Sequence, residues 1–248
     1  AQGGIIYKGL NDSPQKLKKD ILNAGAGHCW EEAVNQLCQH GPELVEEILL
    51  EKLNASFDRN QKGLKRVAEG AHSDPRVIYS KDKTGLSIHQ AALEYLQKLP
   101  NVEILTSHTA IDLLTFSHHS TESTDIYKKP TCFGAVVLNN DCEVLSILAS
   151  KTILATGGLG QLFLHTTNPK EATGDGIAMA WRAGARCFNL HYIQFHPTSL
   201  YHPSGRFLIS EAVRGEGGKL INAKGEEFMQ KYHKLGALAP RDVVSRAI

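Results

Sequence analysis

The sequence has almost no charge imbalance and no long apolar run, and these two absences exclude several classes of protein. Its 248 residues carry 27 lysines and arginines against 26 aspartates and glutamates, a formal net charge of +1. Such a balance argues against a nucleic-acid-binding surface and against a polybasic membrane patch. The apolar runs at 147–149 and 152–155 are far shorter than the ~20 residues of a bilayer-spanning helix. We therefore expect no nucleic-acid partner and no membrane segment.

Cysteine patterns that bind zinc or perform dithiol chemistry are missing as well. The five cysteines are scattered along the chain, and no two of them have the CxxC spacing. Zinc sites and redox dithiols commonly use that spacing, so we expect no metal. An odd number of scattered cysteines also gives no disulfide framework, which makes a reducing cytoplasm the expected compartment.

What the sequence does contain is a mixture of helix-forming and strand-forming segments. Capping residues, helix-ending glycines and apolar residues three or four positions apart predict helices at 14–23, 28–40, 42–53, 87–99 and 175–183. Short β-rich runs predict strands at 102–105, 133–138, 143–148 and 151–155, with a hairpin turn at 139–141. The polar segment 117–129 is expected to be a solvent loop. This mixture predicts an α/β fold.

Three short segments upstream of residue 180 allow both a structural and a functional interpretation. The glycines of ATGG, residues 155–158, follow a predicted strand, and they indicate either an ordinary turn or a close backbone approach to a cofactor. TGDG, residues 173–176, either caps a helix or directs a helix N-terminus at a cofactor. EGAHS, residues 69–73, is either a solvated turn or a substrate loop.

Near the C-terminus, a histidine, a hydroxyl beside a carboxylate, and two arginines lie within about fifty residues of one another. These residues are His196, Ser210, Glu211, Arg214 and Arg241. A lone histidine is more often structural than catalytic, and an arginine at a helix start is usually an ion-pair partner. Taken together, however, they are typical of a site that binds a small dicarboxylate, because guanidinium groups and charge-assisted hydrogen bonds hold carboxylates best.

The order and spacing of these segments resemble one flavoprotein family. That family contains the L-aspartate oxidases and the flavoprotein subunits of succinate dehydrogenase and fumarate reductase. The resemblance is carried by the segments AQGG, EGAHS, ATGG, TTNPKEATGDGIAMAWRAGA, QFHPTSLYHP, SEAVRGEGG and LAPRDVVSRAI. It extends through essentially the whole chain and is densest from residue 151 to residue 248.

Within that family the chain is most similar to the L-aspartate oxidases, mainly because of EGAHSDPRV, residues 69–77. The resemblance implies that Glu69 orients the amino group of the substrate, whereas the succinate dehydrogenases have a glutamine-containing pattern in this stretch. The physical chemistry agrees, because an ammonium group needs an anion or acceptors near it. A dicarboxylate without an amine would be repelled by the Glu69 carboxylate.

The resemblance implies a fold built from two partial domains. Residues 1–187 would belong to a Rossmann-like FAD-binding domain that lacks its Gly-rich dinucleotide fingerprint. Residues 188–248 would begin an α+β capping domain that contributes to the substrate site. N-terminal and C-terminal portions of the full enzyme are expected to be missing from this sequence.

The resemblance also assigns roles to individual residues. It implies FAD-binding positions at Ala1, Gln2, Gly3, Gly4, Thr109, Ala110 and Asp175. It implies substrate-binding positions at Glu69, His196, Ser210 and Glu211, and a catalytic role in proton transfer for Arg241. Two positions differ from the common pattern of the family, which more often has threonine in place of Ser210 and glycine in place of Ala71.

The implied activity is the FAD-dependent oxidation of L-aspartate to iminoaspartate. The electron acceptor would be oxygen, giving hydrogen peroxide, or fumarate, and a functional link to quinolinate synthase in de novo NAD biosynthesis is implied. Two alternatives remain at this point. One is a flavoprotein subunit of a fumarate reductase or succinate dehydrogenase, and the other is a truncated chain that has no catalytic role.

Overall fold

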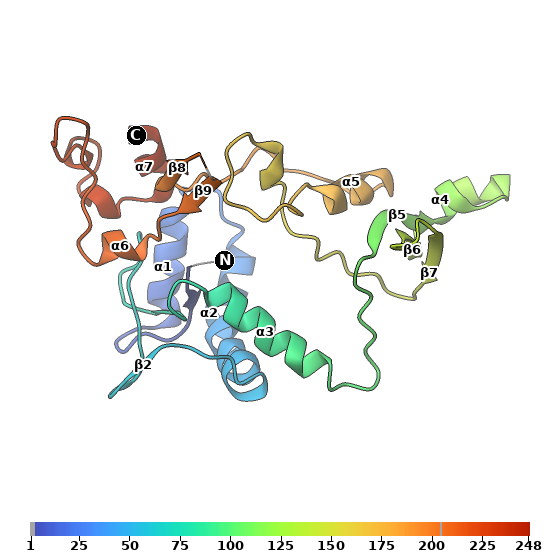
Figure 1. The fold of residues 1–248 in the computed structure, drawn as a ribbon, viewed down its shortest axis with the longest axis horizontal. Coiled ribbons are helices and arrows are strands. Elements are labelled where there is room, and N and C mark those ends of the chain that lie inside the picture. The colour runs from blue at the N-terminus through green and yellow to red at the C-terminus, as the bar shows by residue number, and fades with distance from the viewer. Residues whose placement is uncertain (1–2, 204) are drawn as a thin grey trace. The chain divides into compact units, whose positions relative to one another are not determined.

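The computed structural model describes residues 3–203 and 205–248, and it divides the chain into two compact units. One unit comprises Ala1–Val102 together with Gln194–Ile248, and the other comprises Glu103–Ile193. Both units contain helices and antiparallel strands (Figure 1), which confirms the expected mixture. Ala1 and Gln2, two of the predicted FAD-binding positions, lie outside the described residues.

Three helices of the first unit were expected from the sequence. Helix α1 (Pro14–Ala24) begins as predicted, because the Ser13 side chain accepts a hydrogen bond from the backbone N–H of Lys16. Helix α2 (Glu31–Leu44) packs against α1 around a small buried core, and α3 (Thr84–Leu96) follows later in the chain. None of the helices in the described ranges is long and apolar enough to cross a bilayer.

The expected break between two helices at Gly41 and Pro42 is wrong. Helix α2 continues through both residues, and the chain then winds into a π-helix over Val45–Lys52. A proline inside a helix loses one hydrogen-bond donor and crowds the preceding turn, and wider π turns occur where regular pairing is disturbed. Val45 is buried and packs with Tyr7 and Phe57, and this packing stabilises the continuous run from α2 into the π-helix.

Short antiparallel strand pairs join distant parts of the first unit. Strand β1 (Ile5–Ile6) pairs with β4 (Val77–Ile78), so the residues after the N-terminal glycines run beside the residues that follow the EGAHS segment. Two hairpins are also present, β2 (Arg59–Asn60) with β3 (Gly63–Leu64) and β8 (Ser199–His202) with β9 (Gly205–Leu208). The chain then forms α6 (Ala212–Gly215), two 3₁₀ turns (Met229–Lys231 and Gly236–Leu238) and α7 (Arg241–Ala247).

A buried arginine fastens the EGAHS segment to helix α1. Arg76 is fully buried, and its Nε and Nη2 donate to the two carboxylate oxygens of Asp12 at 2.6 and 2.8 Å. Its Nη1 donates to Asp20 at 2.6 Å, and the same Asp20 oxygen accepts from the backbone and the hydroxyl of Ser73. Burial alone would raise the pKa values of Asp12 and Asp20, but their hydrogen bonds to Arg76 outweigh it and lower both.

The second unit is built on a three-stranded antiparallel sheet. Its strands are β5 (Thr109–Thr115), β6 (Cys132–Leu138) and β7 (Val144–Leu148), in the order β5-β6-β7. The β6–β7 hairpin was predicted and is confirmed. Helix α5 (Asp175–Arg182) was also predicted, and its Arg182 side chain donates to Asp112 of β5. A 3₁₀ turn at Gly160–Leu162 precedes α5.

Three expectations for residues 102–155 are wrong. Residues 102–105 and 151–155 form no strand, because no described segment pairs with them. β propensity alone does not supply the hydrogen bonds of a sheet. The predicted loop at 117–129 contains α4 (Phe116–His119) and a 3₁₀ helix (Ser123–Tyr127). The ring of Phe116 packs against Phe133 with their centroids 4.9 Å apart, and the Lys128 ammonium lies 5.2 Å from the Phe116 ring centroid. These contacts order the polar segment.

Candidate active site

A pocket of about 200 Å³ in the first unit brings together three of the predicted site residues, Glu69, Glu211 and Arg241. The EGAHS segment forms one side of it, and the N-terminal turn of α7 forms another. Its walls consist of Ala24, Glu69, Gly70, Ala71, His72, Gln194, Glu211, Pro240, Arg241 and Asp242. Residues that are far apart in the sequence therefore surround one small, polar cavity.

Glu211 is the link between the segments that form this pocket. It is almost fully buried, its Oε2 accepts from Arg241 Nε at 2.5 Å, and its Oε1 accepts from the backbone N–H of Gly70 at 2.8 Å. Burial would raise the pKa of Glu211, but the hydrogen bond and charge of Arg241 outweigh it and lower that pKa. Glu211 is thus held as a carboxylate.

Arg241 is held in place yet still reaches the pocket. It is the first residue of α7 and follows Pro240, so the rigid helix start fixes its backbone. Its Nη1 donates to Gln194 Oε1 at 3.0 Å, and its Nη2 lies 3.8 Å from a carboxylate oxygen of Glu69. One third of the side chain remains exposed, so the guanidinium is accessible to an anionic ligand.

Glu69 lies between this arginine and the N-terminal glycines. Its pKa is raised by burial and by the negative charge of Glu211, while Arg241 and a hydrogen bond from the backbone of Gly4 act in the opposite direction. Gly3 is its neighbour as well, because a Cβ atom added at Gly3 would lie 3.7 Å from Glu69 Oε1. Two predicted cofactor positions are therefore adjacent to a predicted substrate position.

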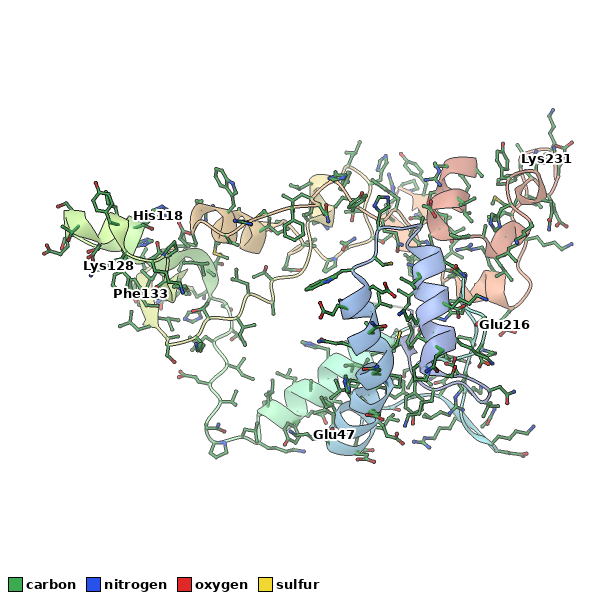
Figure 2. The ribbon with its side chains drawn as sticks, turned by 180° about the vertical axis from the view of Figure 1, so that it is seen from behind. Glu47, His118, Lys128, Phe133, Glu216 and Lys231 are labelled. Atoms are coloured by element: carbon green, nitrogen blue, oxygen red, sulfur yellow. The ribbon has the colours of Figure 1, made fainter. Side chains whose placement is uncertain are left out.

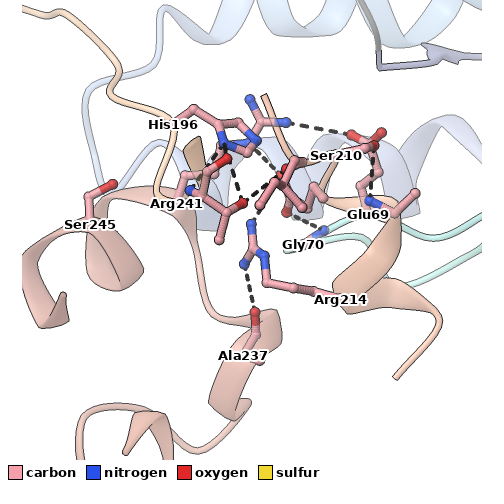
Figure 3. Close-up of polar contacts among 12 residues, drawn as sticks. Glu69, Gly70, His196, Ser210, Arg214, Ala237, Arg241 and Ser245 are labelled. Carbon is pink, nitrogen blue, oxygen red and sulfur yellow. Dashed lines mark hydrogen bonds and ion pairs between the residues drawn. The ribbon is translucent and has the colours of Figure 1, made fainter. Parts of the chain in front are cut away.

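His196 and Ser210 lie near the pocket but do not line it. His196 Nδ1 is 3.0 Å from the carbonyl oxygen of Thr198, and the pKa of His196 is lowered by burial and by the charge of Arg241. Ser210 Oγ accepts from the backbone N–H of Ala212 at 3.3 Å, which places this hydroxyl at the start of α6. Figure 3 shows both residues beside Glu69 and Arg241.

Arg214 was noted in the sequence but given no role. The structure places its guanidinium beside the Glu211 carboxylate. Arg214 is buried, its Nη1 donates to the carbonyl oxygen of Ala237 at 2.6 Å, and its Nη2 lies 3.7 Å from Glu211 Oε2. Burial lowers the pKa of Arg214, and the nearby charge of Arg241 adds to this effect. Its place three residues after Glu211, on a short helix, was the available sequence signal.

The second unit has a glycine-lined backbone that fits a cofactor approaching closely. An added Cβ at Gly157 or Gly158 would meet nothing within 4 Å, whereas one at Gly176 would lie 1.8 Å from Thr156 Oγ1. The backbone N–H of Gly174 donates to the carbonyl oxygen of Gly158, which fixes this loop against the start of α5. The residues present therefore suit a planar or phosphorylated group such as FAD.

The remaining predicted FAD positions of this unit are exposed. Asp175 is the first residue of α5, and its Oδ2 accepts from the Thr173 hydroxyl at 2.7 Å. Thr109 and Ala110 begin β5 and pair with Leu138 and Val137 of β6. Within the described ranges, no group of three histidine, cysteine, aspartate or glutamate side chains could hold a metal ion.

Comparison with curated proteins finds L-aspartate oxidases. L-aspartate oxidase 1 of Ralstonia nicotianae is 44% identical over 254 residues, covering 100% of this chain and 46% of that protein. L-aspartate oxidase of Synechocystis sp. is 45% identical over 250 residues, covering 100% and 43%. The chain thus spans less than half the length of these two relatives, and the similarity to L-aspartate oxidases predicted from its motifs is confirmed.

Solved structures and a family model agree with this result. An Escherichia coli quinol fumarate reductase FrdA variant matches with a TM-score of 0.84 at 26% identity, covering 100% of this chain and 42% of that one. Mycobacterium smegmatis Sdh1 in complex with UQ1 matches with a TM-score of 0.74 at 30% identity, covering 100% and 42%. The family model described as "FAD binding domain" matches residues 1–248, so the chain belongs to that flavoprotein family and FAD is its cofactor, as expected.

Proposed function

We propose that this chain forms the catalytic part of an FAD-dependent L-aspartate oxidase, which converts L-aspartate to iminoaspartate. The observation that carries the proposal is the position of the Glu69 carboxylate beside Arg241 in one pocket. Arg241 suits a substrate carboxylate, and Glu69 suits a substrate ammonium group. The curated relatives named above are L-aspartate oxidases, which supports the same substrate.

Arg241 would act first as a carboxylate clamp. A guanidinium stays protonated throughout the pH range in which proteins are folded, so it binds anions well and is a poor base. In the other half-reaction, in which fumarate would be reduced to succinate, Arg241 starts protonated and is suited to donate the proton to carbon. Glu211 supports both roles, because its hydrogen bond to Nε fixes the direction in which the guanidinium faces.

His196 and Ser210 would complete the substrate shell beside Arg241. Positioning is itself a large contribution, since holding the reacting carbon in the right geometry lowers the activation barrier by several kcal/mol, about 7 or more at best. FAD supplies the two-electron redox chemistry when it is bound. Gly3 and Gly4 beside Glu69, together with Ala1, Gln2, Thr109, Ala110 and Asp175, would hold that cofactor.

The wider organisation follows from the same proposal. Residues 1–187 would contribute to the FAD-binding domain, and residues 188–248 would contribute to the capping domain. Oxygen, giving hydrogen peroxide, or fumarate would reoxidise the enzyme. The product iminoaspartate would pass to quinolinate synthase in the cytoplasm, on the route to NAD.

Flavin reduction by two substrates tests the proposal. The purified, FAD-loaded protein is mixed anaerobically with L-aspartate or with succinate, and the visible flavin absorbance is followed. L-aspartate should bleach the flavin and succinate should not. Bleaching by succinate alone would instead favour a succinate dehydrogenase or fumarate reductase flavoprotein, a candidate supported by the TM-score of 0.84 to the fumarate reductase variant. Acid-precipitated protein that stays yellow would point the same way, since a covalent flavin survives denaturation.

A further inference from the structure

His72 lines the same pocket as Glu69 and Arg241, and one of its ring nitrogens has a fixed partner. His72 Nδ1 lies 3.2 Å from Arg76 Nη1. A guanidinium nitrogen can only donate a hydrogen bond, so Nδ1 must be the acceptor. A neutral imidazole whose Nδ1 accepts carries its proton on Nε2. The contact with Arg76 therefore determines the tautomer of His72.

Arg76 cannot turn away from this contact. It is fully buried, and its other donors are engaged by the carboxylates of Asp12 and Asp20. Protonation of His72 would bring two donors face to face at Nδ1, which is unfavourable. Burial and the charge of Arg76 lower the pKa of His72, while the carboxylates of Asp20, Glu211 and Asp12 act in the opposite direction.

The pocket walls offer few hydrogen-bond donors to a dicarboxylate, and the imidazole of His72 would be one of them. These walls contain the carboxylates of Glu69, Glu211 and Asp242 but only one guanidinium, that of Arg241. A dicarboxylate has two carboxylate groups, and Arg241 can clamp one of them bidentately. The second requires a further hydrogen-bond donor, and the protonated Nε2 of a neutral His72 is such a donor on the pocket wall.

We propose that His72 is a substrate-binding residue that donates a hydrogen bond from Nε2 to a carboxylate of the bound dicarboxylate. Arg76 is then a positioning residue, because it acts on the substrate only by fixing the His72 tautomer. The proposal rests on the proposed function for the identity of the substrate class. It adds a hydrogen-bond donor on the pocket wall to the substrate contacts proposed for Arg241, His196 and Ser210.

Two substitutions at His72 distinguish the loss of its hydrogen-bond donor from the loss of its packing volume. The amide of glutamine reaches the place of Nε2 and can donate there, whereas leucine has a similar volume and no donor. The probe is succinate, a dicarboxylate that should leave the flavin oxidised if the proposed function holds. Its dissociation constant is read from the perturbed flavin spectrum of the FAD-loaded protein. We expect His72→Leu to weaken succinate binding about tenfold or more. His72→Gln should stay within about threefold of the wild type.

A third variant keeps the test decisive if His72→Leu does not fold. In His72→Asn the shorter amide reaches only the place of Nδ1, so it retains the contact with Arg76 but loses the donor to the pocket. Weak succinate binding by His72→Asn and tight binding by His72→Gln would support the proposal. Equal binding by both, or wild-type binding by His72→Leu, would overturn it.

Two further measurements separate this inference from the proposed function. With L-aspartate as substrate, the loss in His72→Leu should fall mainly on KM and leave kcat less affected. If the wild type does not oxidise L-aspartate, the proposed function fails, yet succinate still tests His72. Its dissociation constant is compared among the variants if the flavin stays oxidised, and its KM is compared if succinate reduces the flavin. Nitrogen NMR of the imidazole should show a proton on Nε2, and a proton on Nδ1 of the neutral ring would contradict the tautomer.

Discussion

Glu211 and Arg241 lie 30 positions apart in the chain, yet they share a hydrogen bond of 2.5 Å. The same carboxylate accepts from the Gly70 backbone and lies 3.7 Å from the guanidinium of Arg214. One buried anion thus compensates two cations and fastens the EGAHS segment to α7. The stability and the geometry of the pocket both depend on this charge.

Glu211→Gln is predicted to destabilise the protein by on the order of 3 kcal/mol at neutral pH, because it leaves the buried Arg214 without a charge partner. The pKa of Glu211 is lowered on folding, so its stabilising effect is present above its ordinary pKa of 4.5. The effect is lost as pH falls through the lower pKa of the folded state. Urea unfolding at several pH values measures this difference.

Glu216→Gln is the matched control for that measurement. Glu216 lies five residues further along, and its side chain is exposed (Figure 2). Its substitution should change the free energy of unfolding by no more than ~0.5 kcal/mol. Equal effects of the two substitutions, or an effect of Glu211→Gln that does not weaken in acid, would contradict the role assigned to Glu211.

Glu69→Gln is predicted to have the opposite effect on stability. Burial and Glu211 raise the pKa of Glu69 on folding, so its ionised form destabilises the folded state at neutral pH. That cost is fully present above the folded pKa and vanishes below the ordinary value of 4.5. The variant should therefore unfold at a higher urea concentration than the wild type at pH 7, and at the same concentration in acid.

The same substitution should damage function. An uncharged amide attracts the ammonium group of L-aspartate less than a carboxylate does, so kcat/KM for L-aspartate should fall about tenfold or more. Succinate, which has no amine, should bind Glu69→Gln more tightly than it binds the wild type. A variant that is less stable at neutral pH, or that prefers L-aspartate as strongly as before, would refute the role assigned to Glu69.

Gly158→Ala is predicted to weaken FAD binding without weakening the fold. An alanine Cβ at this position would meet no protein atom within 4 Å, so the apoprotein should keep its stability. A cofactor lying against the Gly157–Gly158 backbone would meet the new methyl group, and FAD affinity should fall about tenfold or more. Quenching of flavin fluorescence during a titration measures the affinity, and unchanged affinity would place the cofactor elsewhere.

Local sequence signals predicted the elements that depend on a few neighbouring residues. The start of α1 at Pro14 and the β6–β7 hairpin follow from capping and turn residues, which act over a few positions. Residues 151–155 had the right composition for a strand but found no partner among the described segments. Pairing is a long-range property, and a single sequence does not encode it in any one window.

The candidate site also has residues that the sequence could identify and residues that it could not. The types of residue that suit a dicarboxylate could be found in the sequence, and Glu211 and Arg241 do meet. The roles of Arg76 and His72 could not, because they depend on carboxylates more than fifty positions upstream, Asp12 and Asp20. Nothing near Arg76 in the sequence indicates that it would be fully buried.

Ala71→Gly is predicted to stabilise the protein slightly. Ala71 has a φ of 66°, a left-handed conformation that costs an L-residue about 1–2 kcal/mol. Glycine avoids that cost but gives up about 0.5–1 kcal/mol to its more flexible unfolded state, so the net gain is at most about 1.5 kcal/mol. Ala33→Gly, at an exposed position inside α2, should lose about 1 kcal/mol instead. Thermal unfolding of both variants provides the comparison.

Arg76→Leu is predicted to cost about 3–5 kcal/mol, because it leaves Asp12 and Asp20 buried without a cation. Arg246→Leu is the control, since it removes an exposed i,i+4 pair with Asp242 that is worth at most about 1 kcal/mol. The two aspartates have lowered pKa values on folding, so they stabilise the wild type above their ordinary value of 3.8 and lose this effect in acid. Without Arg76 the sign should reverse, and acid should stabilise the variant by neutralising the two unpaired carboxylates. Unfolding midpoints at pH 7 and near pH 3, below the ordinary pKa of the aspartates, distinguish these outcomes. A parallel loss in both proteins would show that the aspartates are not held by Arg76.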